Sequence, residues 1–401
     1  MKQGVPGFIP QRLEEAMEAR DISGVSLAQL MGRSSSSSIT RWLKGEQSPE
    51  PTGLAELSRA LNLPSAYFLR PMPAHGPAPL FYRSMASITK GARGKAKARL
   101  RWCQDISLEL QNYIDLPECN LPDLVNGRDF RILEDSEIER LATDLRRYWN
   151  LGDGPISDLH LLLENNGIVI IHDEVEAAAM DGLSSWSEVD GRGYIYVAID
   201  KPSAVRGRFN VAHELGHLVL HRHVDSSTLV KTEEFKEIER QANLFAAAFL
   251  IPAESFDAEL AALTLSGFLA LKERWKISVG MMIKRVEALG LASEEYVRRL
   301  WKYYSARGWR KFEPLDDRLP FEQPRLLARS IRLLAEEGGW NLQQILAQIS
   351  FAPSDIERLT SLPVGYLSAS AADVMQMPRI KNNSKISGAP TGKVVRFPSR
   401  R

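Results

Sequence analysis

Apolar residues recur at helical spacing through the first segment of the chain, which ends near residue 72. One short apolar stretch, VSLAQLMG, ends at Gly32, which suits a helix C-terminus, and a serine-rich turn follows it. The pattern predicts about five short helices, two of which are joined by that turn. The residues expected to hold this pair of helices together are Leu27, Leu30, Ile39 and Trp42.

Beyond this segment the pattern changes twice. Four prolines between residues 70 and 79 predict a linker, and a long helix is expected after it in the segment WCQDISLELQNYIDL. A helix in DSEIERLATDLRRYWNL then precedes three segments of strand character, GIVIIHDEV, DGLSSWSEV and GYIYVAID. A histidine-rich helix, a second helix from about 233 to 250 and further helices complete the prediction.

These elements predict an α+β fold that is mostly helical and contains a small β-sheet. A chain of 401 residues has room for several domains. The predicted parts are a five-helix helix-turn-helix domain at 1–72, a linker and basic helical connector at 73–129, a domain that contains the strands at 130–300, a helical C-terminal region at 301–375 and a disordered basic tail at 376–401.

Composition narrows the class of protein but does not identify its partners. The chain is 44% hydrophobic and 25% charged, and its net charge is +1. Two cysteines without metal-binding spacing, and no apolar stretch of signal or membrane length, favour a soluble cytoplasmic protein without membrane contact. Seven Lys or Arg and no acid lie in 81–104, and the same holds for 379–401. Such runs are usually solvated, but they can also contact phosphates.

The segment AHELGHLVLHRH, residues 212–223, contains four of the seven histidines. His213 and His217 are four residues apart, so on a helix both imidazoles project from one face and reach one metal ion. Glu214 lies between them, where it can accept a proton from a water molecule and act as the catalytic base of peptide hydrolysis. This pattern is typical of zinc metalloproteases and predicts Zn²⁺ as cofactor. A helix with histidines of no function would bury imidazoles at a cost in desolvation.

Two residues are candidates for the third metal ligand. His223 follows His213 by ten residues, but the class that uses this spacing needs glycine at position 220, where this chain has Leu220. Glu239 lies in EIERQANLFAAAFLIP on the next predicted helix and is favoured on ligand geometry. Asn243, one turn further on, is expected to hydrogen-bond a ligand histidine from outside the ligand shell.

The remaining histidines near this segment are expected to have no role at the metal. His221 continues the four-residue series, yet we expect it to be a bystander, as we do His223 if Glu239 is the ligand. His172 lies in a predicted strand and is expected to be structural.

The serine-rich turn of the first segment predicts contact with DNA. In a helix-turn-helix, the second helix presents its N-terminal half to the edges of the bases. Serine bonds either bases or phosphate, and arginine or lysine bonds phosphate or guanine. A helical bundle that contacts another protein is the alternative. The residues expected to face DNA are Ser35, Ser36, Ser37, Thr40, Arg41 and Lys44.

On these residues, about 9–70 of the chain resembles the lambda-repressor-like, or XRE, helix-turn-helix family, although the turn from Gly32 to Ile39 is one residue longer than usual there. The segments DGLSSW, RGRFNVAHELGHLVLHRH and ERQANLFAAAFLIP resemble the ImmA/IrrE family of metallo-endopeptidases, over about 130–300. The segment YSARGWRKFEPLD resembles the tail of bacterial regulators that fuse these two modules. The resemblance implies zinc ligands at His213, His217 and Glu239, and the catalytic base at Glu214.

The resemblance also implies a function, because members of the ImmA/IrrE family cut helix-turn-helix repressors that control mobile elements or stress genes. We therefore expect a cytoplasmic regulator that binds an operator through its first domain and cleaves a protein substrate with zinc. An edge among the strands at 167–199 is expected to hold the substrate as an added strand. Two alternatives remain, a non-proteolytic DNA-binding regulator whose zinc is structural or senses metal, and self-cleavage in the serine-rich turn. The sequence leaves open whether the chain forms a homodimer.

Overall fold

The computed structural model describes residues 4–76, 81–82, 89–174, 180–200, 203–225 and 227–368. The predicted tail at 376–401 lies outside the described residues, as do Arg83 of the first basic run and the last residues of the predicted C-terminal region. Every element below belongs to one compact unit, Met1–Leu367. The described residues form sixteen α-helices and one small sheet, so the predicted α+β, mostly helical class is confirmed.

The first segment forms five helical elements, as its apolar pattern predicts. Leu27, Ile39 and Trp42 are buried between helices, also as predicted. The prediction for Leu30 is wrong, because its side chain is 60% exposed. The buried residues of its helix are Leu27 and Ala28 instead. The five elements are α1 (Pro10–Arg20), α2 (Gly24–Leu30), α3 (Ser37–Leu43), α4 (Pro51–Leu61) and the 3₁₀ helix η1 (Ser65–Leu69).

The long helix after the linker, α5 (Lys90–Gln111), begins earlier than the predicted start at Trp102. The hydroxyl of Thr89 accepts a hydrogen bond from Ala92 N–H and caps the helix, and the lysines, arginines and alanines that follow are strong helix formers. The first basic run is therefore mostly helical. Part of it is used inside the fold, since buried Arg99 bonds Asp173 at 2.6 Å.

The sheet contains all three predicted strands and one unpredicted strand. Its order is β1-β3-β4-β2, in which β2 is parallel to β4 and the other neighbours are antiparallel. The unpredicted strand, β1, falls within the predicted linker and connector and pairs with the outer edge of β3. The strands are β1 (Phe81–Tyr82), β2 (Val169–Asp173), β3 (Gly182–Ser187) and β4 (Arg192–Ala198).

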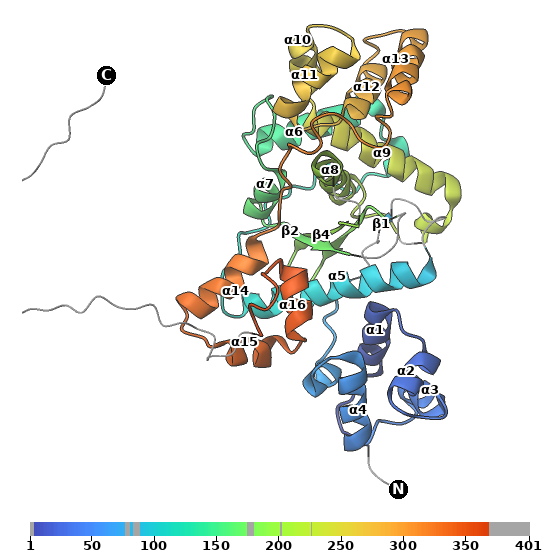
Figure 1. Ribbon diagram of the computed structural model, residues 1–401, viewed down its shortest axis with the longest axis vertical. Coiled ribbons are helices and arrows are strands. Elements are labelled where there is room, and N and C mark those ends of the chain that lie inside the picture. Colours follow the sequence, from blue (N-terminus) through green and yellow to red (C-terminus); the bar gives the residue numbers. More distant parts are fainter. Residues whose placement is uncertain are drawn as a thin grey trace, which may run out of the picture. The chain divides into compact units, whose positions relative to one another are not determined.

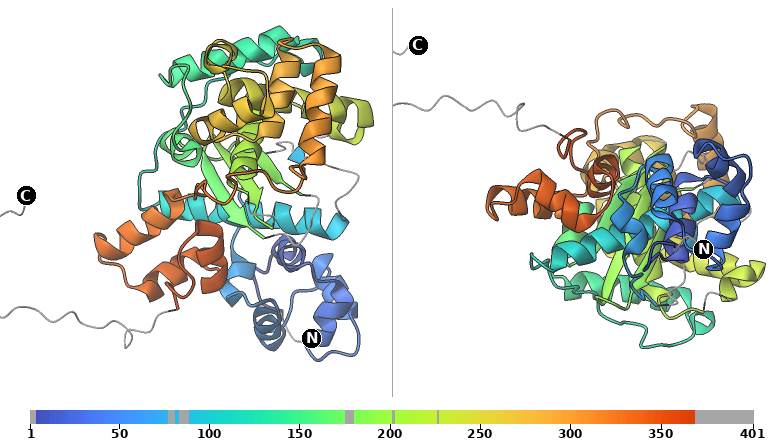
Figure 2. Two further views of the ribbon diagram at one scale, coloured as in Figure 1. Left: turned by 45° about the horizontal axis from the view of Figure 1, so that its top comes forward. Right: turned by 90° about the horizontal axis from the view of Figure 1, so that it is seen from below.

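Alternate side chains of the central strands enter two different cores. Val169 and Ile171 of β2 pack into a core shared with α5 and the N-terminal helices, whereas Ile170 packs into a core shared with helix α8 (Ala204–Leu220). On β4, Tyr194 packs into the core shared with α5, and Ile195 packs into the core shared with α8. The sheet thus lies between α5 on one face and α8 on the other (Figures 1 and 2).

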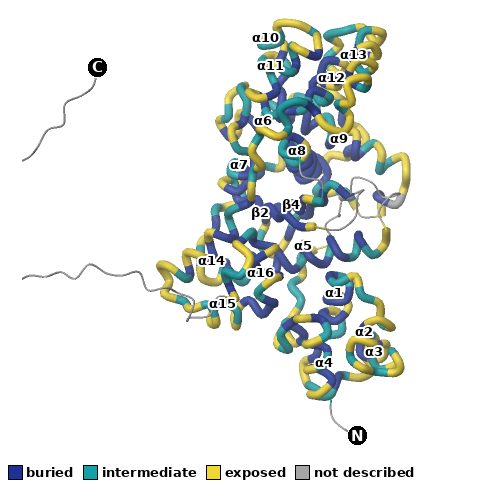
Figure 3. Tube along the Cα trace, in the orientation of Figure 1, coloured by how far each residue is buried: buried dark blue, intermediate teal, exposed yellow. Residues whose placement is uncertain are grey.

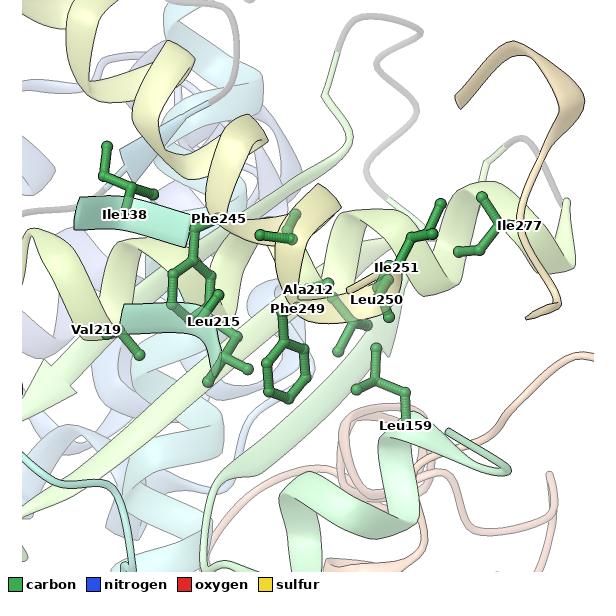
Figure 4. Packing of buried hydrophobic residues seen from close by; sticks show 14 of the residues in the cluster. Ile138, Leu159, Ala212, Leu215, Val219, Phe245, Phe249, Leu250, Ile251 and Ile277 are labelled. Atoms are coloured by element: carbon green, nitrogen blue, oxygen red, sulfur yellow. The ribbon is translucent and has the colours of Figure 1, made fainter. Parts of the chain in front are cut away.

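Helix α8 is buried along most of its length (Figure 3) and packs closely against α9 (Thr232–Leu250). Leu215 and Val219 of α8 lie beside Phe245 and Phe249 of α9 (Figure 4). Gly216 permits this close approach, because a Cβ atom there would lie 3.1 Å from the carbonyl oxygen of Ala242. The two helices that carry the predicted metal ligands are therefore held rigidly against each other.

Short helices surround this centre, and the predicted C-terminal region is helical where it is described. Helices α14 to α16 pack on α5 or on β2. None of the described helices has the length and apolarity that a membrane span requires. The remaining elements are η2 (Phe130–Ile132), α6 (Asp135–Tyr148), α7 (Leu159–Asn165), η3 (Thr228–Val230), α10 (Ala253–Glu259), α11 (Leu265–Trp275), α12 (Val279–Ala288), α13 (Glu294–Ala306), α14 (Leu326–Glu336), α15 (Leu342–Ile349) and α16 (Pro353–Thr360).

Candidate metal centre

Helices α8 and α9 bring the favoured ligand residues to one point. The Nε2 atoms of His213 and His217 are 3.0 Å apart. The carboxylate of Glu239 places Oε2 at 3.4 Å from Nε2 of His213 and Oε1 at 3.2 Å from Nε2 of His217. All three residues are buried. Of the two candidates for the third ligand, only Glu239 joins this group, because the exposed His223 bonds Asp123 at 2.8 Å.

The three donors fit a zinc ion. Ligand atoms at 2.0–2.1 Å from zinc in tetrahedral geometry are about 3.3–3.4 Å from one another, close to the separations of these three residues. Two imidazole nitrogens and one carboxylate oxygen are also a usual ligand set of catalytic zinc. Oε1 of Glu239 is buried and has no hydrogen-bond partner, and a cation would satisfy it.

A chain of hydrogen bonds behind His217 fixes which of its nitrogens carries a proton. The side-chain amide of Gln241 donates hydrogen bonds to the carbonyl oxygen of Phe130 at 2.8 Å and to Glu237 at 3.0 Å. Its remaining polar atom, Oε1, can only accept, so it accepts from Nε2 of His221 at 3.0 Å. Nδ1 of His221 then has no proton and accepts from Nδ1 of His217 at 3.1 Å. Nε2 of His217 is then the unprotonated nitrogen, and its lone pair faces His213 and Glu239, as a metal ligand requires.

The same burial keeps these groups in the charge states that metal binding needs. Burial, and then the neighbouring histidine, lower the pKa of His221 to about 3. Burial lowers the pKa of His217 to about 4, so both imidazoles are neutral at pH 7. Burial by itself raises the pKa of Glu239, but the two adjacent imidazoles outweigh it and hold this pKa well below its usual range.

The hydrogen bonds of His221 do not fit the expectation that it is a bystander. Its ring is fully buried and bonds Nδ1 of His217, a predicted ligand, at 3.1 Å. The four-residue spacing from His217 was the available signal, but the acceptor Gln241 lies on another helix and its position cannot be deduced from spacing. His172 lies in strand β2, where a strand was predicted, and its Nε2 lies 2.9 Å from Nε2 of buried His160.

Replacement of His221 by leucine is expected to weaken zinc binding by about 10–100-fold, because the hydrogen bond that orients His217 is lost. The zinc dissociation constant, measured by competition with a chelating dye, tests this. His223→Leu is the matched control, since that histidine is two residues away, is exposed and bonds Asp123 and Arg222. Equal zinc affinity in the two variants would show that His221 does not orient His217.

Strand β3 positions the predicted base. Oε2 of buried Glu214 accepts a hydrogen bond of 2.7 Å from the hydroxyl of Ser184. A Cβ atom at Gly182 would lie 2.9 Å from Oε1 of Glu214, so a larger residue there would press on the carboxylate. The sequence prediction did not include Gly182 or Ser184, although both lie in DGLSSW, because the pairing of that strand with α8 is a long-range contact.

The prediction for Asn243 is not met by the hydrogen bonds of the structure. Its amide donates to the main-chain oxygen of Glu239 at 2.7 Å, rather than to a ligand histidine. Its side chain also lines a cleft of about 540 Å³. Asn210, one turn before His213 on α8, lines the same cleft, as does Asp181, which precedes β3. The cleft therefore adjoins the predicted metal centre.

A second group of ligand-type residues, Asp158, His160 and Glu322, serves as an anchor. Glu322 pairs with Arg208 and accepts from the ring of His160 at 3.1 Å and from Leu159 N–H at 2.8 Å. Although burial opposes it, the bond from His160 and the charge of Arg208 lower the pKa of Glu322 to about 2. The carboxylate is fully used in attaching the segment before α14, which gives no reason to place a metal there.

The predicted DNA-contacting residues lie on and around the short helix α3. Ser35, Ser37, Thr40, Arg41 and Lys44 are exposed. Ser36 is half-buried, and its carbonyl oxygen accepts from the hydroxyl of Thr40 at 3.2 Å. The N-terminal part of α3 thus presents hydroxyl groups and one guanidinium to solvent, as a recognition helix requires.

Comparison with known families agrees with both parts of this description. Residues 13–68 match the family model described as a helix-turn-helix, and residues 163–287 match the model described as an IrrE N-terminal-like domain, of a metallopeptidase family. The second match covers the sheet strands β2 to β4 and both helices of the candidate metal centre. No curated protein gives a significant match to the chain.

Proposed function

We propose that this protein is a DNA-binding regulator that uses zinc to cleave another protein. Its chain joins an XRE-type helix-turn-helix module to an IrrE/ImmA-like metallopeptidase module. One observation carries the proposal. Three buried zinc-type ligands converge, and beside them a carboxylate, Glu214, is held by a sheet strand rather than used as a ligand. This is the composition of a catalytic site.

Each of these residues would have a separate role in peptide hydrolysis. His213, His217 and Glu239 would hold the zinc. Zinc at this site supplies a Lewis acid that polarises the scissile carbonyl and lowers the pKa of water. Glu214 accepts a proton from the attacking water and returns it to the leaving amine. Ser184 donates a hydrogen bond to Oε2 of Glu214 and so holds the carboxylate in place for this transfer.

We propose a helix-turn-helix repressor as the substrate, on the resemblance to the ImmA/IrrE family. The test is to incubate the zinc-loaded protein with repressors encoded beside its gene and to identify fragments by mass spectrometry. A fragment that forms with the wild type and not with Glu214→Gln supports the proposal. Failure to cleave any of these repressors, or any unfolded test protein, would contradict it.

The main alternative is a regulator in which zinc is structural or senses metal. A structural zinc site closes its coordination with four protein ligands, whereas the candidate centre offers three among the residues that the structure describes. A structural site also needs no carboxylate positioned as Glu214 is by Ser184. Both observations favour the peptidase.

Replacement of both Arg41 and Lys44 by alanine is expected to weaken DNA binding and to reduce the dependence of log K on log salt by about 2, since each phosphate contact contributes about 1. Fluorescence anisotropy with a mixed-sequence duplex at several salt concentrations measures this. Arg59→Ala with Arg147→Ala is the control, because it removes the same charge from exposed sites away from α3. An unchanged salt dependence would assign the phosphate contacts to other residues, such as the basic run of α5.

A further inference from the structure

The outer edge of β3 is covered by the chain's own segment between the helix-turn-helix domain and α5. Phe81 pairs with Ser184, and Tyr82 with Leu183, in antiparallel register. Further along the same edge, Glu188 N–H donates to the carbonyl oxygen of His75 at 3.2 Å. We call the described residues His75, Gly76, Phe81 and Tyr82 the connector strand.

Side-chain contacts hold the first half of the connector strand in the same place. Nδ1 of His75 is 3.2 Å from the hydroxyl of Ser187. Gly76 has φ +85°, and a Cβ atom there would lie 2.5 Å from the side chain of Glu188, so glycine is needed where the strand passes this residue. The described residues of the connector strand therefore meet this edge at two places, at Glu188 and at Ser184 and Leu183.

This edge adjoins the candidate catalytic centre. Ser184, the β3 residue that pairs with Phe81, is also the residue that holds the base Glu214. The opposite edge of β3 is occupied by β4 over six residue pairs. A peptide added to β3 can pair only along the edge where the connector strand now lies, and main-chain pairing of this kind binds peptides with little demand on their sequence.

We propose that the connector strand occupies the peptide-binding edge of β3, and that an extended segment of a protein substrate must displace it. Of the strands expected at 167–199, β3 has this edge partly covered by the described chain itself, while β2 forms the other edge of the sheet. Two paired residues form a much shorter ladder than the six between β3 and β4, so a longer peptide can compete. That displacement leads to cleavage rests on the proposed peptidase function. That the edge is occupied does not depend on that function.

The connector strand also reaches the helix-turn-helix domain within a few residues. The guanidinium of Arg12, on α1, donates to the carbonyl oxygens of Arg70 at 3.2 Å and of Pro71 at 2.8 Å. It also pairs with Asp105 of α5, which lies 3.6 Å from Nε2 of His75. Contacts made by α1 and by the connector strand are thus linked through one buried group of charges.

The test uses the full chain with Glu214→Gln and bound zinc, so that peptide binding is measured without cleavage. Phe81→Pro with Tyr82→Pro removes main-chain donors from the connector strand, whereas Phe81→Ala with Tyr82→Ala keeps them and is the matched control. The probe is a labelled synthetic peptide with the sequence of residues 73–86. We expect it to bind the proline variant at least about tenfold more tightly than the alanine variant, and the β3 amides that point away from β4 to exchange hydrogen faster in the proline variant before peptide is added.

Gly76→Val provides a second route to the same result, with Gly290→Val as control, since Gly290 also has positive φ but no neighbour at its Cβ position. Equal peptide affinity in the proline and alanine variants, with equal protection of β3, would overturn the proposal. Because the readouts are binding and hydrogen exchange, they decide it whether or not any variant cleaves protein. A displaced connector strand in a chain that never cleaves would instead contradict the peptidase function alone.

Discussion

Replacement of Glu214 by glutamine is expected to reduce cleavage by at least about 10²–10⁴-fold while zinc remains bound, because the amide cannot accept the proton of the attacking water. Glutamine has nearly the same shape, and its oxygen can still accept the hydrogen bond of Ser184. The ligands His213, His217 and Glu239 are unchanged. Cleavage of the identified repressor under single-turnover conditions and the zinc content of the purified variant together measure the effect.

The control for this variant is Glu254→Gln, which makes the same chemical change at an exposed position after α9. It should cleave at the wild-type rate. If Glu214→Gln also cleaves at that rate, Glu214 is not the base. If the variant loses cleavage yet regulates its genes in cells as the wild type does, proteolysis is not the function, and the non-proteolytic alternative accounts for the regulation.

The elements of this fold could be predicted because their signals are local. The three strand segments each combine β-branched or aromatic residues with flanking turn residues. Strands β2 and β3 form within them, and β4 begins one residue before its segment. The spacing of His213 and His217 alone placed both imidazoles on one face of a helix, and α8 brings their Nε2 atoms to 3.0 Å. Leu30 shows the limit of such reasoning, because a seven-residue helix leaves the choice of buried face to its neighbours.

What could not be predicted depends on contacts between distant parts of the chain. Phe81 and Ser184 are separated by about a hundred residues, and a two-residue strand in a proline-rich connector has no periodic pattern. Gln241 orients His221 only because α8 and α9 pack closely at Gly216. The residues that contribute chemistry were found from their types and spacing, whereas the residues that position them were found only from the packing.

Replacement of Glu239 by glutamine tests the third ligand. A neutral amide is a poor zinc ligand, and groups outside the ligand shell already contribute about 10–100-fold in affinity, so we expect zinc binding to weaken by more than about 100-fold. The variant should also lose the rise in melting temperature that zinc gives the wild type, since a ligand at 100 times its dissociation constant stabilises a protein by about 2.7 kcal/mol. Dye competition and thermal unfolding with and without zinc measure both effects.

The matched comparison is His223→Ala, which removes the other candidate ligand. His223 is exposed and bonds Asp123, so this variant should keep the zinc affinity of the wild type. The reverse result, with zinc retained by Glu239→Gln and lost by His223→Ala, would require α8 to bend at Leu220 and would contradict the geometry of the centre. Loss of zinc in both variants would place a fourth protein ligand at the metal, and the centre would then be closed in the manner of a structural site. The pair of variants therefore decides which of the two candidates is the third protein ligand, without any measurement of cleavage.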